Sequence, residues 1–179
     1  MLRILDITAP DINNGNGVRV TLWVAGCTNH CKGCHNQWTW DYDQGKPFRD
    51  NKDEILGKLA SWLERDYVEG LTLSGGDPMC QDEEALLDIL SICKWVREKF
   101  PEKNIWLYTG LTYESIVENQ KFKFWEAKTK KKITAVKNAQ KKVLESIDVL
   151  VDGPYIEELR DISHCPFRGS TNQRIMKMN

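Results

Sequence analysis

Apolar and polar residues alternate along the chain with two different periods, and this pattern predicts strands that alternate with helices. Residues 18–24 alternate strictly and are rich in β-branched side chains, which is typical of a strand, and residues 2–7 predict a shorter strand beside it. Residues 70–73 and 104–108 predict short buried strands, and residues 147–151 predict a late one.

Apolar residues at helical spacing predict helices between these strands. The first helix is expected to begin at Asp50 or Asn51, either of which can cap it, and to end near Tyr67. A second is expected over residues 82–100, and a third begins at Thr112. Because strand, turn and helix recur in this order, the sequence predicts an α/β fold in which helical crossovers join parallel strands.

Length and charge narrow the class of protein. The 179 residues match the size of one domain, so we expect a single domain over residues 1–179. The formal net charge of -1 gives no sign of a protein that coats nucleic acid or a membrane surface. The chain shows neither a signal peptide nor an apolar stretch long enough to span a bilayer. We therefore expect a cytoplasmic protein with no membrane partner and no direct contact with nucleic acid.

One segment departs from this average composition. Residues 121–142 hold nine lysines and a single acid, Glu126. The later part of the segment predicts a lysine-rich helix with one buried stripe, formed by Val136, Ala139, Val143 and Leu144. We interpret the segment as a solvated insertion, and a docking patch for an acidic partner or nucleic acid is the alternative.

Three of the six cysteines crowd into one loop after the strand at residues 18–24. Cys27, Cys31 and Cys34 have the spacing C-x3-C-x2-C, which in a chain without an export signal indicates metal binding rather than a disulfide framework. A closed structural zinc site requires four ligands, whereas a 4Fe-4S cluster on three cysteines leaves one iron open to an outside ligand. Zinc stays open as an alternative, because a histidine in or beside the loop could be the fourth ligand.

The other cysteines receive no role in the site. Cys93 lies on the apolar face of its predicted helix and is expected in the core, and Cys80 is expected to be partly buried at the start of that helix. Cys165 stands beside His164, and a pair of this kind is more often structural than functional.

The cysteine spacing directly after a strand resembles the signature of the radical S-adenosylmethionine superfamily. The resemblance implies a shortened, incomplete (β/α) barrel of mostly parallel strands, with the cluster loop after the first barrel strand. It also implies that S-adenosylmethionine binds the open iron, and that one electron from the cluster cleaves it to a 5′-deoxyadenosyl radical. A full eight-stranded barrel would need a longer chain than 179 residues.

Further residues are similar to the cofactor-binding positions of that superfamily. Its glycine-glycine-acid-proline motif is matched by Ser74, Gly75, Gly76 and Asp77. The resemblance implies that Asp77 and the neighbouring strand edge accept hydrogen bonds from the methionine ammonium group. Gly33 stands where many members have an aromatic residue, so backbone atoms are expected to meet the adenine there. Thr109, after the strand at residues 104–108, is expected near the cofactor ribose.

Three more sequence elements resemble one subgroup, the activating enzymes of glycyl-radical enzymes. Cys34-His35-Asn36 is followed by a tryptophan-rich run, and the elements 152–155 and 168–174 resemble the D-G-x-[FY] and R-G-S-x-N-Q-R sequences of anaerobic ribonucleotide reductase activating enzymes. We regard residues 165–179 as the carboxyl-terminal element of this subgroup. The residues assigned to the partner or substrate region are Arg19, His35, Asn36, Asp152, Gly169, Ser170, Asn172, Gln173 and Arg174.

The resemblance implies an activase that takes a hydrogen atom from one glycine of a large partner. The expected partner is the large subunit of anaerobic ribonucleoside-triphosphate reductase, and a flavodoxin or a thioredoxin-linked system is the expected one-electron donor. Activation of another glycyl-radical enzyme, such as pyruvate formate-lyase, is one alternative. A non-enzymatic zinc-binding interaction module is the other.

Overall fold

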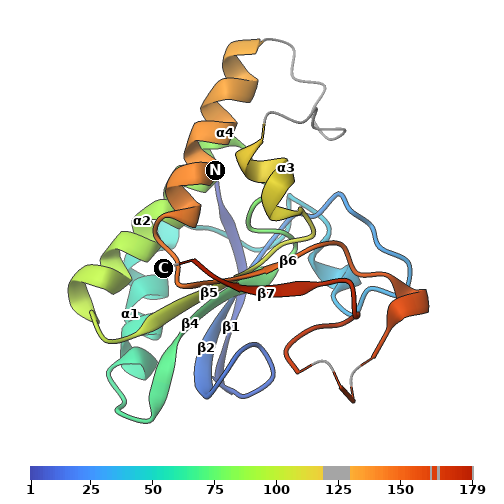
Figure 1. Cartoon of the computed structure of the whole chain (residues 1–179). Helices are drawn as coiled ribbons and strands as arrows, with labels where there is room; N and C mark the ends of the chain where they lie inside the picture. Colours follow the sequence, from blue (N-terminus) through green and yellow to red (C-terminus); the bar gives the residue numbers. More distant parts are fainter. Residues whose placement is uncertain (119–129, 162, 165, 179) are drawn as a thin grey trace.

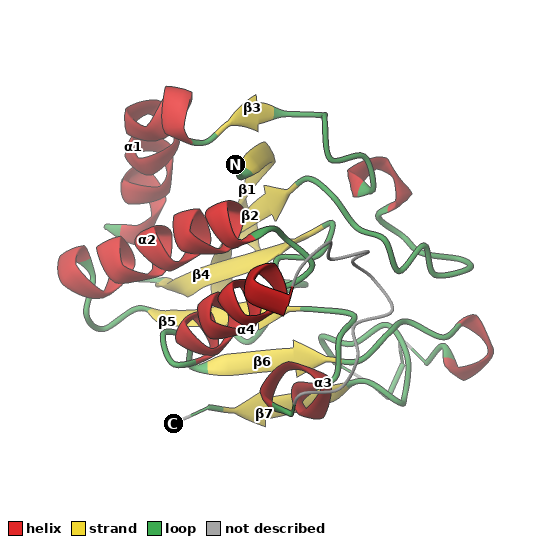
Figure 2. Ribbon diagram, turned by 90° about the horizontal axis from the view of Figure 1, so that it is seen from above, coloured by secondary structure: helices red, strands yellow, loops and turns green. Residues whose placement is uncertain are grey.

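The computed structural model describes residues 1–118, 130–161, 163–164 and 166–178, excluding the side chains of residues 130–132. The strands are β1 (Arg3–Asp11), β2 (Val18–Val24), β3 (Lys46–Pro47), β4 (Val68–Gly75), β5 (Asn104–Tyr108), β6 (Val149–Asp152) and β7 (Arg174–Lys177). The main helices are α1 (Lys52–Leu63), α2 (Glu83–Lys99), α3 (Tyr113–Val117) and α4 (Lys130–Leu144). The described strands form one sheet in the order β3-β1-β2-β4-β5-β6-β7 (Figures 1 and 2).

The middle of the sheet is parallel. Strands β2, β4, β5 and β6 pair in parallel, whereas β1, β3 and β7 are attached to the sheet by antiparallel pairing. The expected α/β class, with helical crossovers between parallel strands, is therefore confirmed. In the described part of the chain, β3 and β7 end the strand order and do not pair with each other, so the sheet is open and a barrel is not confirmed.

Most helix boundaries follow from local signals in the sequence. The Asp82 side chain accepts a hydrogen bond from the Ala85 amide at 2.7 Å and starts α2, as expected of a capping aspartate. Asn51 precedes α1, but its side chain donates to the Pro47 carbonyl at 2.9 Å and does not cap the helix. Helix α1 ends at Leu63, earlier than the predicted Tyr67, and β4 begins at Val68 soon afterwards.

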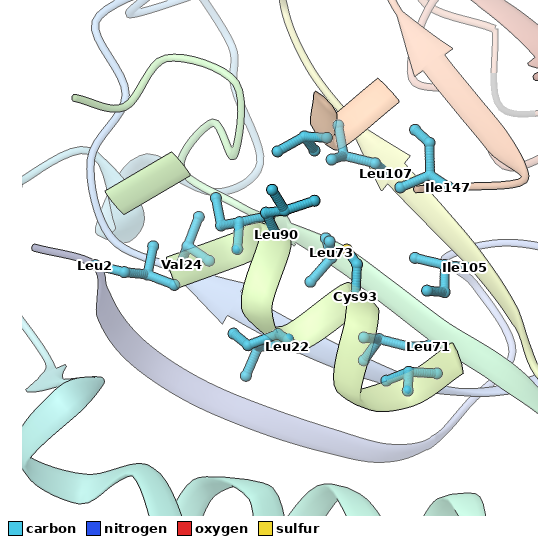
Figure 3. Close-up of a cluster of buried hydrophobic side chains, with 14 of the residues drawn as sticks. Leu2, Leu22, Val24, Leu71, Leu73, Leu90, Cys93, Ile105, Leu107 and Ile147 are labelled. Atoms are coloured by element: carbon cyan, nitrogen blue, oxygen red, sulfur yellow. The ribbon is translucent and has the colours of Figure 1, made fainter. Parts of the chain in front are cut away.

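The two faces of the sheet differ in chemistry. Alternate residues of the parallel strands, among them Leu71, Leu73, Ile105 and Leu107, join the apolar core on the face that carries helices α1, α2 and α4 (Figures 2 and 3). Cys93 of α2 is fully buried in this core, which confirms the prediction for it. The residues between them in β4 and β5 point to the opposite face, where polar and aromatic side chains predominate.

Loops cover the polar face. The Thr72 hydroxyl donates to the Asn14 carbonyl at 2.7 Å, which fixes the loop between β1 and β2 over the strands. From the other side, the Tyr108 hydroxyl donates to the Phe167 carbonyl at 2.9 Å, and the Phe167 ring packs edge-on against Trp106 at 5.8 Å. The polar face is therefore enclosed between two loops that are far apart in the sequence.

The lysine-rich segment lies partly within the described structure. Helix α4 buries Ala139, Val143 and Leu144 and half-buries Val136, so the predicted apolar stripe is confirmed. Residues 121–129, the first part of the segment, lie outside the described residues. The interpretations of the segment as a solvated insertion or a docking patch therefore stay predictions. Among the helices that the structure describes, none combines the length and the apolar character needed to cross a membrane.

One ion-pair cluster joins the last strands to α3. Arg174 Nε donates to Asp152 Oδ1 at 2.9 Å, and its Nη1 donates to Glu114 Oε1 at 2.9 Å. The Asp152 side chain is buried and also accepts the Tyr113 amide at 2.7 Å. The hydrogen bond from Arg174 lowers the pKa of Glu114 to about 2, below its ordinary value of 4.5. This cluster holds the exposed strand β7 against the sheet.

Replacing Arg174 with methionine should lower the free energy of unfolding at pH 7 by about 3 kcal/mol, because the buried Asp152 carboxylate loses its countercharge. In the wild type, the depressed pKa of Glu114 stabilises the fold fully above pH 4.5, and this contribution is lost as the pH falls through about 2. The free energy of unfolding of the variant should therefore fall less than that of the wild type between pH 4.5 and about 2. Urea unfolding of the metal-free chain, followed by tryptophan fluorescence, measures both effects.

Lys58→Met is the matched control, because Lys58 forms an exposed ion pair with Glu54 at 3.0 Å. Such a pair contributes roughly 0–1 kcal/mol. Equal losses in the two variants would show that the Asp152 pair has no special role.

Candidate functional site

The cysteine loop leaves the sheet at the end of β2. Cys27 is buried, and Cys31 and Cys34 are partly exposed. The backbone closes a turn between the last two cysteines, where the Cys34 amide donates to the Cys31 carbonyl at 3.1 Å. Burial is the main cause that raises the pKa of Cys27 to about 12, and burial also raises that of Cys31. The five described cysteines are free thiols.

Backbone amides surround the thiols of the cysteine loop. Backbone amides point at all three sulfurs: Asn36 donates to Cys34 Sγ at 3.4 Å, Tyr155 donates to Cys31, and Asn29 and His30 donate to Cys27. Such amides commonly surround cluster sulfurs and tune them. The structure has no preformed group of three or more described Cys, His, Asp or Glu side chains that could hold a metal ion. His30 stacks on Trp40 with ring centroids 4.5 Å apart.

Two glycines join the base of the loop to β4. The Gly76 amide donates to the Val24 carbonyl at 2.8 Å, and the Asp77 amide donates to the Gly26 carbonyl at 2.8 Å. A Cβ at Gly76 would lie 2.3 Å from the Gly26 carbonyl oxygen, a contact that backbone atoms cannot relieve. Gly75 has a φ of 111°, which favours glycine. This pair therefore allows the ends of β2 and β4 to approach closely beneath the cysteines.

Asp77 is the most densely bonded side chain of the site. Its carboxylate is 1% exposed. Oδ1 accepts hydrogen bonds from the Met79 amide at 2.9 Å, the Cys80 amide at 3.3 Å and the Thr109 hydroxyl at 2.8 Å. Oδ2 accepts from Asn29 Nδ2 at 3.0 Å, the Cys80 thiol at 3.1 Å and the Gly110 amide at 2.9 Å. The carboxylate thus connects the cysteine loop, the end of β5 and the turn before α2.

These contacts bear on the residues predicted to hold the cofactor. Asn29 and Gly110 already donate hydrogen bonds to the Asp77 carboxylate, which was expected to accept hydrogen bonds from the methionine ammonium group. The Thr109 hydroxyl also accepts from the Leu111 amide at 3.1 Å, so it is bonded within the protein. Ser74 is almost fully buried and lines a cleft beside the cysteines.

Gly33 faces a carboxylate. It has a φ of 73°, and a Cβ there would lie 1.9 Å from Glu157 Oε2. That carboxylate also accepts the Tyr155 hydroxyl at 2.6 Å. The space that an aromatic residue would occupy in many superfamily members is therefore held by Glu157. The predicted adenine contact at Gly33 stays a prediction.

Arg19 lies near the start of β2, whereas the cysteine loop follows its end. Its side chain is fully buried and donates to Thr72 Oγ1 at 2.6 Å, to Asn104 Oδ1 at 2.8 Å and to the Leu71 carbonyl at 2.7 Å. Burial lowers its pKa to about 10. Because its donors are directed at protein groups on the polar face, beneath the loops that cover it, the structure does not bring Arg19 to a surface where a partner could touch it.

The two carboxyl-terminal motifs bind each other. Asn172 Nδ2 donates to the Pro154 carbonyl at 2.8 Å, and Gln173 Nε2 donates to the Gly153 carbonyl at 3.0 Å. The Ile156 amide donates to the Ser170 hydroxyl at 3.2 Å. Asp152 and Arg174 form the ion pair described above. Several residues predicted for the partner region therefore shape the segment that follows β6 and covers the cysteine loop.

A cleft of about 650 Å³ opens beside the cysteine loop, over the polar face of the sheet. Its lining includes His35, Asn36, Gly169 and Gln173 from the predicted partner region, together with Cys34 and Ser74. The other nine lining residues were not predicted as site residues, and Trp23, Tyr108, Tyr155 and Arg168 are among them. Tyr155 and Arg168 stand inside the motifs that were recognised, which is the one signal that could have identified them.

Comparison with known proteins agrees with this arrangement. The profile of the family described as 4Fe-4S single cluster domain matches residues 13–176. The chain is 37% identical over 166 residues to the anaerobic ribonucleoside-triphosphate reductase-activating protein of Enterobacteria phage T4, covering 92% of this chain and 87% of the relative. The proteins of the same name from Escherichia coli K12 and Vibrio cholerae are 36% and 37% identical over 164 and 166 residues, covering 90% and 91% of those relatives.

These matches span nearly the whole chain and include the cysteine loop, the Asp77 turn and the carboxyl-terminal motifs. The chain therefore belongs to the family of anaerobic ribonucleoside-triphosphate reductase-activating proteins and carries its 4Fe-4S single cluster domain.

Proposed function

We propose that this protein is a radical S-adenosylmethionine enzyme that activates an anaerobic ribonucleoside-triphosphate reductase by forming a glycyl radical on its large subunit. The observation that carries the proposal is the loop of three free cysteines, held by Gly76 and Asp77 at the carboxyl end of parallel strands. Ligands of parallel sheets bind at that end. The names of the relatives support the choice of partner over pyruvate formate-lyase and over a zinc-binding module.

Cys27, Cys31 and Cys34 would hold the cluster, and the residues assigned to S-adenosylmethionine are Gly33, Ser74, Gly75, Gly76, Asp77 and Thr109. The cluster would supply one-electron reductive cleavage of the carbon–sulfur bond of S-adenosylmethionine, with an external donor as the source of the electron; the products would be methionine and, with the hydrogen atom taken from the glycine, 5′-deoxyadenosine. The protein's own part is positioning. Asp77 holds the loop against the ends of β4 and β5, and the aromatic lining of the cleft shields the reacting groups from water.

The finer assignments are part of the same proposal. The electron donor would be a flavodoxin or a thioredoxin-linked system, and the protein would work in the cytoplasm under anaerobic conditions. The open sheet would be the shortened, incomplete barrel that this superfamily uses, with its polar face as the barrel interior. An open site of this kind leaves room for a protein substrate.

Anaerobic reconstitution with iron and sulfide tests the proposal. We expect a brown protein with about four irons per chain. After reduction, it should convert S-adenosylmethionine to methionine and 5′-deoxyadenosine, and with the reductase it should produce the electron paramagnetic resonance signal of a glycyl radical. Pyruvate formate-lyase serves as the control partner and should give no signal. A colourless, zinc-loaded protein without cleavage activity would exclude the proposal.

A further inference from the structure

We propose that Gln140 and Tyr42 are positioning residues for cofactor binding, because they hold the turn that directs the Asp77 carboxylate. This turn comprises residues 77–81, directly before α2. The inference rests on the proposed function, which assigns Asp77 to the S-adenosylmethionine site. Gln140 lies in the lysine-rich helix α4, and Tyr42 lies between the cysteine loop and β3. The two side chains therefore reach the turn from two different elements, neither of which was expected to serve the cofactor.

Gln140 orients one peptide group of this turn. Its Nε2 donates to the Met79 carbonyl at 2.7 Å. The N–H of the same peptide group belongs to Cys80, and it donates to Asp77 Oδ1 at 3.3 Å. Because a peptide group is planar, a donor that fixes its carbonyl also fixes the direction of its N–H. Hydrogen bonds in such a chain also polarise one another. Gln140 therefore acts on Asp77 through a single rigid group.

Tyr42 holds the next peptide group of the turn. Its hydroxyl donates to the Cys80 carbonyl at 2.7 Å. Its ring packs so closely on the base of the cysteine loop that a Cβ at Gly26 would overlap it. The Gly26 carbonyl in turn accepts the Asp77 amide at 2.8 Å. Tyr42 therefore contacts both of the chain segments that meet at Asp77.

The burial of Gln140 indicates a role beyond stability. Helix α4 lies beside α2 over the sheet, and Gln140 is only 1% exposed there (Figure 2). Its Oε1 is buried and has no hydrogen-bond partner among the described residues. Such an acceptor costs free energy of folding, and an apolar side chain at this position would avoid that cost. An apolar side chain could not donate to the Met79 carbonyl, however, so the glutamine matches a requirement for the donor.

The test measures binding of S-adenosylmethionine by the reconstituted holoenzyme. Gln140→Met keeps the length of the side chain and removes the donor, and Tyr42→Phe keeps the ring and removes the hydroxyl. Each variant should raise the KM for S-adenosylmethionine about tenfold, the effect of one hydrogen bond. Iron content and kcat should stay close to wild type, because the three cysteines are unchanged. In the double variant the two effects should be less than additive, since both act on one turn. Electron paramagnetic resonance of the reduced cluster, followed during a titration with S-adenosylmethionine, measures the affinity independently of turnover.

Lys137→Met is the matched control on α4. Lys137 is also buried and also donates to a backbone carbonyl, that of Glu118 at 2.8 Å, but this carbonyl lies at the end of α3 and not in the turn. Tyr67→Phe is the control for the tyrosine variant, because Tyr67 is exposed just before β4. Both controls should keep the wild-type KM for S-adenosylmethionine.

A wild-type KM in both Gln140→Met and Tyr42→Phe would overturn the inference. An equal rise in Lys137→Met would overturn it as well, since the effect would then reflect the packing of α4 in general. If Gln140→Met does not fold, Tyr42→Phe decides alone, because it leaves the packing of the ring intact. A wild-type enzyme that cleaves no S-adenosylmethionine would instead refute the proposed function, and the inference with it.

Discussion

Serine at position 27, 31 or 34 is expected to abolish both cluster assembly and cleavage of S-adenosylmethionine. Iron in these clusters is bound by thiolates, and a serine hydroxyl at the same position is a poor replacement. We expect iron content to fall from about four to well below one per chain. Cleavage should drop by more than about 100-fold, the upper end of the losses caused by weaker changes around metal ligands. Iron analysis and 5′-deoxyadenosine formation measure the two effects.

Cys93→Ala is the matched control for these variants. Cys93 of α2 is fully buried in the apolar core, so its loss should reduce stability while iron content and cleavage activity stay close to wild type. A Cys93 variant that lost its cluster, or a Cys34 variant that kept four irons, would contradict the ligand assignment.

Alanine at position 77 is expected to have the second largest effect. Six donors from the cysteine loop, the β5 end and the turn before α2 converge on this carboxylate. Leaving them without an acceptor should lower the free energy of unfolding by roughly 3 kcal/mol or more, because each buried unsatisfied group costs about 1–3 kcal/mol. Cluster retention should fall as well, since the loop loses its anchor.

Asp88→Ala is the control that distinguishes a specific effect on the cysteine loop from a general loss of stability. Asp88 is a buried aspartate of α2 that accepts Arg49 Nε at 2.7 Å and the Leu2 amide at 3.1 Å, away from the cysteines. Its loss should reduce stability without reducing iron content in the folded protein. Equal iron loss in the two variants at matched folded fraction would show that Asp77 has no special connection to the cluster loop.

Asn29→Ala distinguishes two roles for Asp77. Asn29 donates to Oδ2 of Asp77, the carboxylate expected to accept the methionine ammonium group. If Asp77 contacts the cofactor directly, the variant should bind S-adenosylmethionine as tightly as the wild type or more tightly. If Asp77 instead works by holding the loop, the variant should lose affinity. A titration of S-adenosylmethionine into the reconstituted protein decides between them.

Strands that bury one face were predictable from the sequence. Strand β5 has the bounds that the pattern predicts, because Ile105 and Leu107 face the core while the residues between them face the polar side. Strand β7 was not predicted. Three of its four residues are exposed, and it joins the sheet through backbone pairing with β6, which leaves no pattern in the side chains.

Long-range polar contacts were not predictable. Arg19 was expected near a partner, yet it is buried on the polar face beneath the covering loops, where Thr72 and Asn104 accept its hydrogen bonds. Asp152 and Arg174 were expected in the same region, and they pair with each other to attach β7. In each case the contacting residues are separated by tens of positions, and the order of strands in the sheet brings them together.

The sequence by itself determined that three thiols stand within eight residues, and this keeps them in one short segment, because the length of the chain between them limits how far apart they can lie. It thereby determined metal chemistry and, through resemblance, the kind of cluster. The tertiary structure decided what surrounds that loop. It directed Asn29, Thr109 and Gly110 at Asp77, placed Glu157 over Gly33 and opened a carboxylate-free cleft beside Cys34. These contacts depend on the order of strands in the sheet, which brings together residues far apart in the chain and which no local pattern of residues encodes.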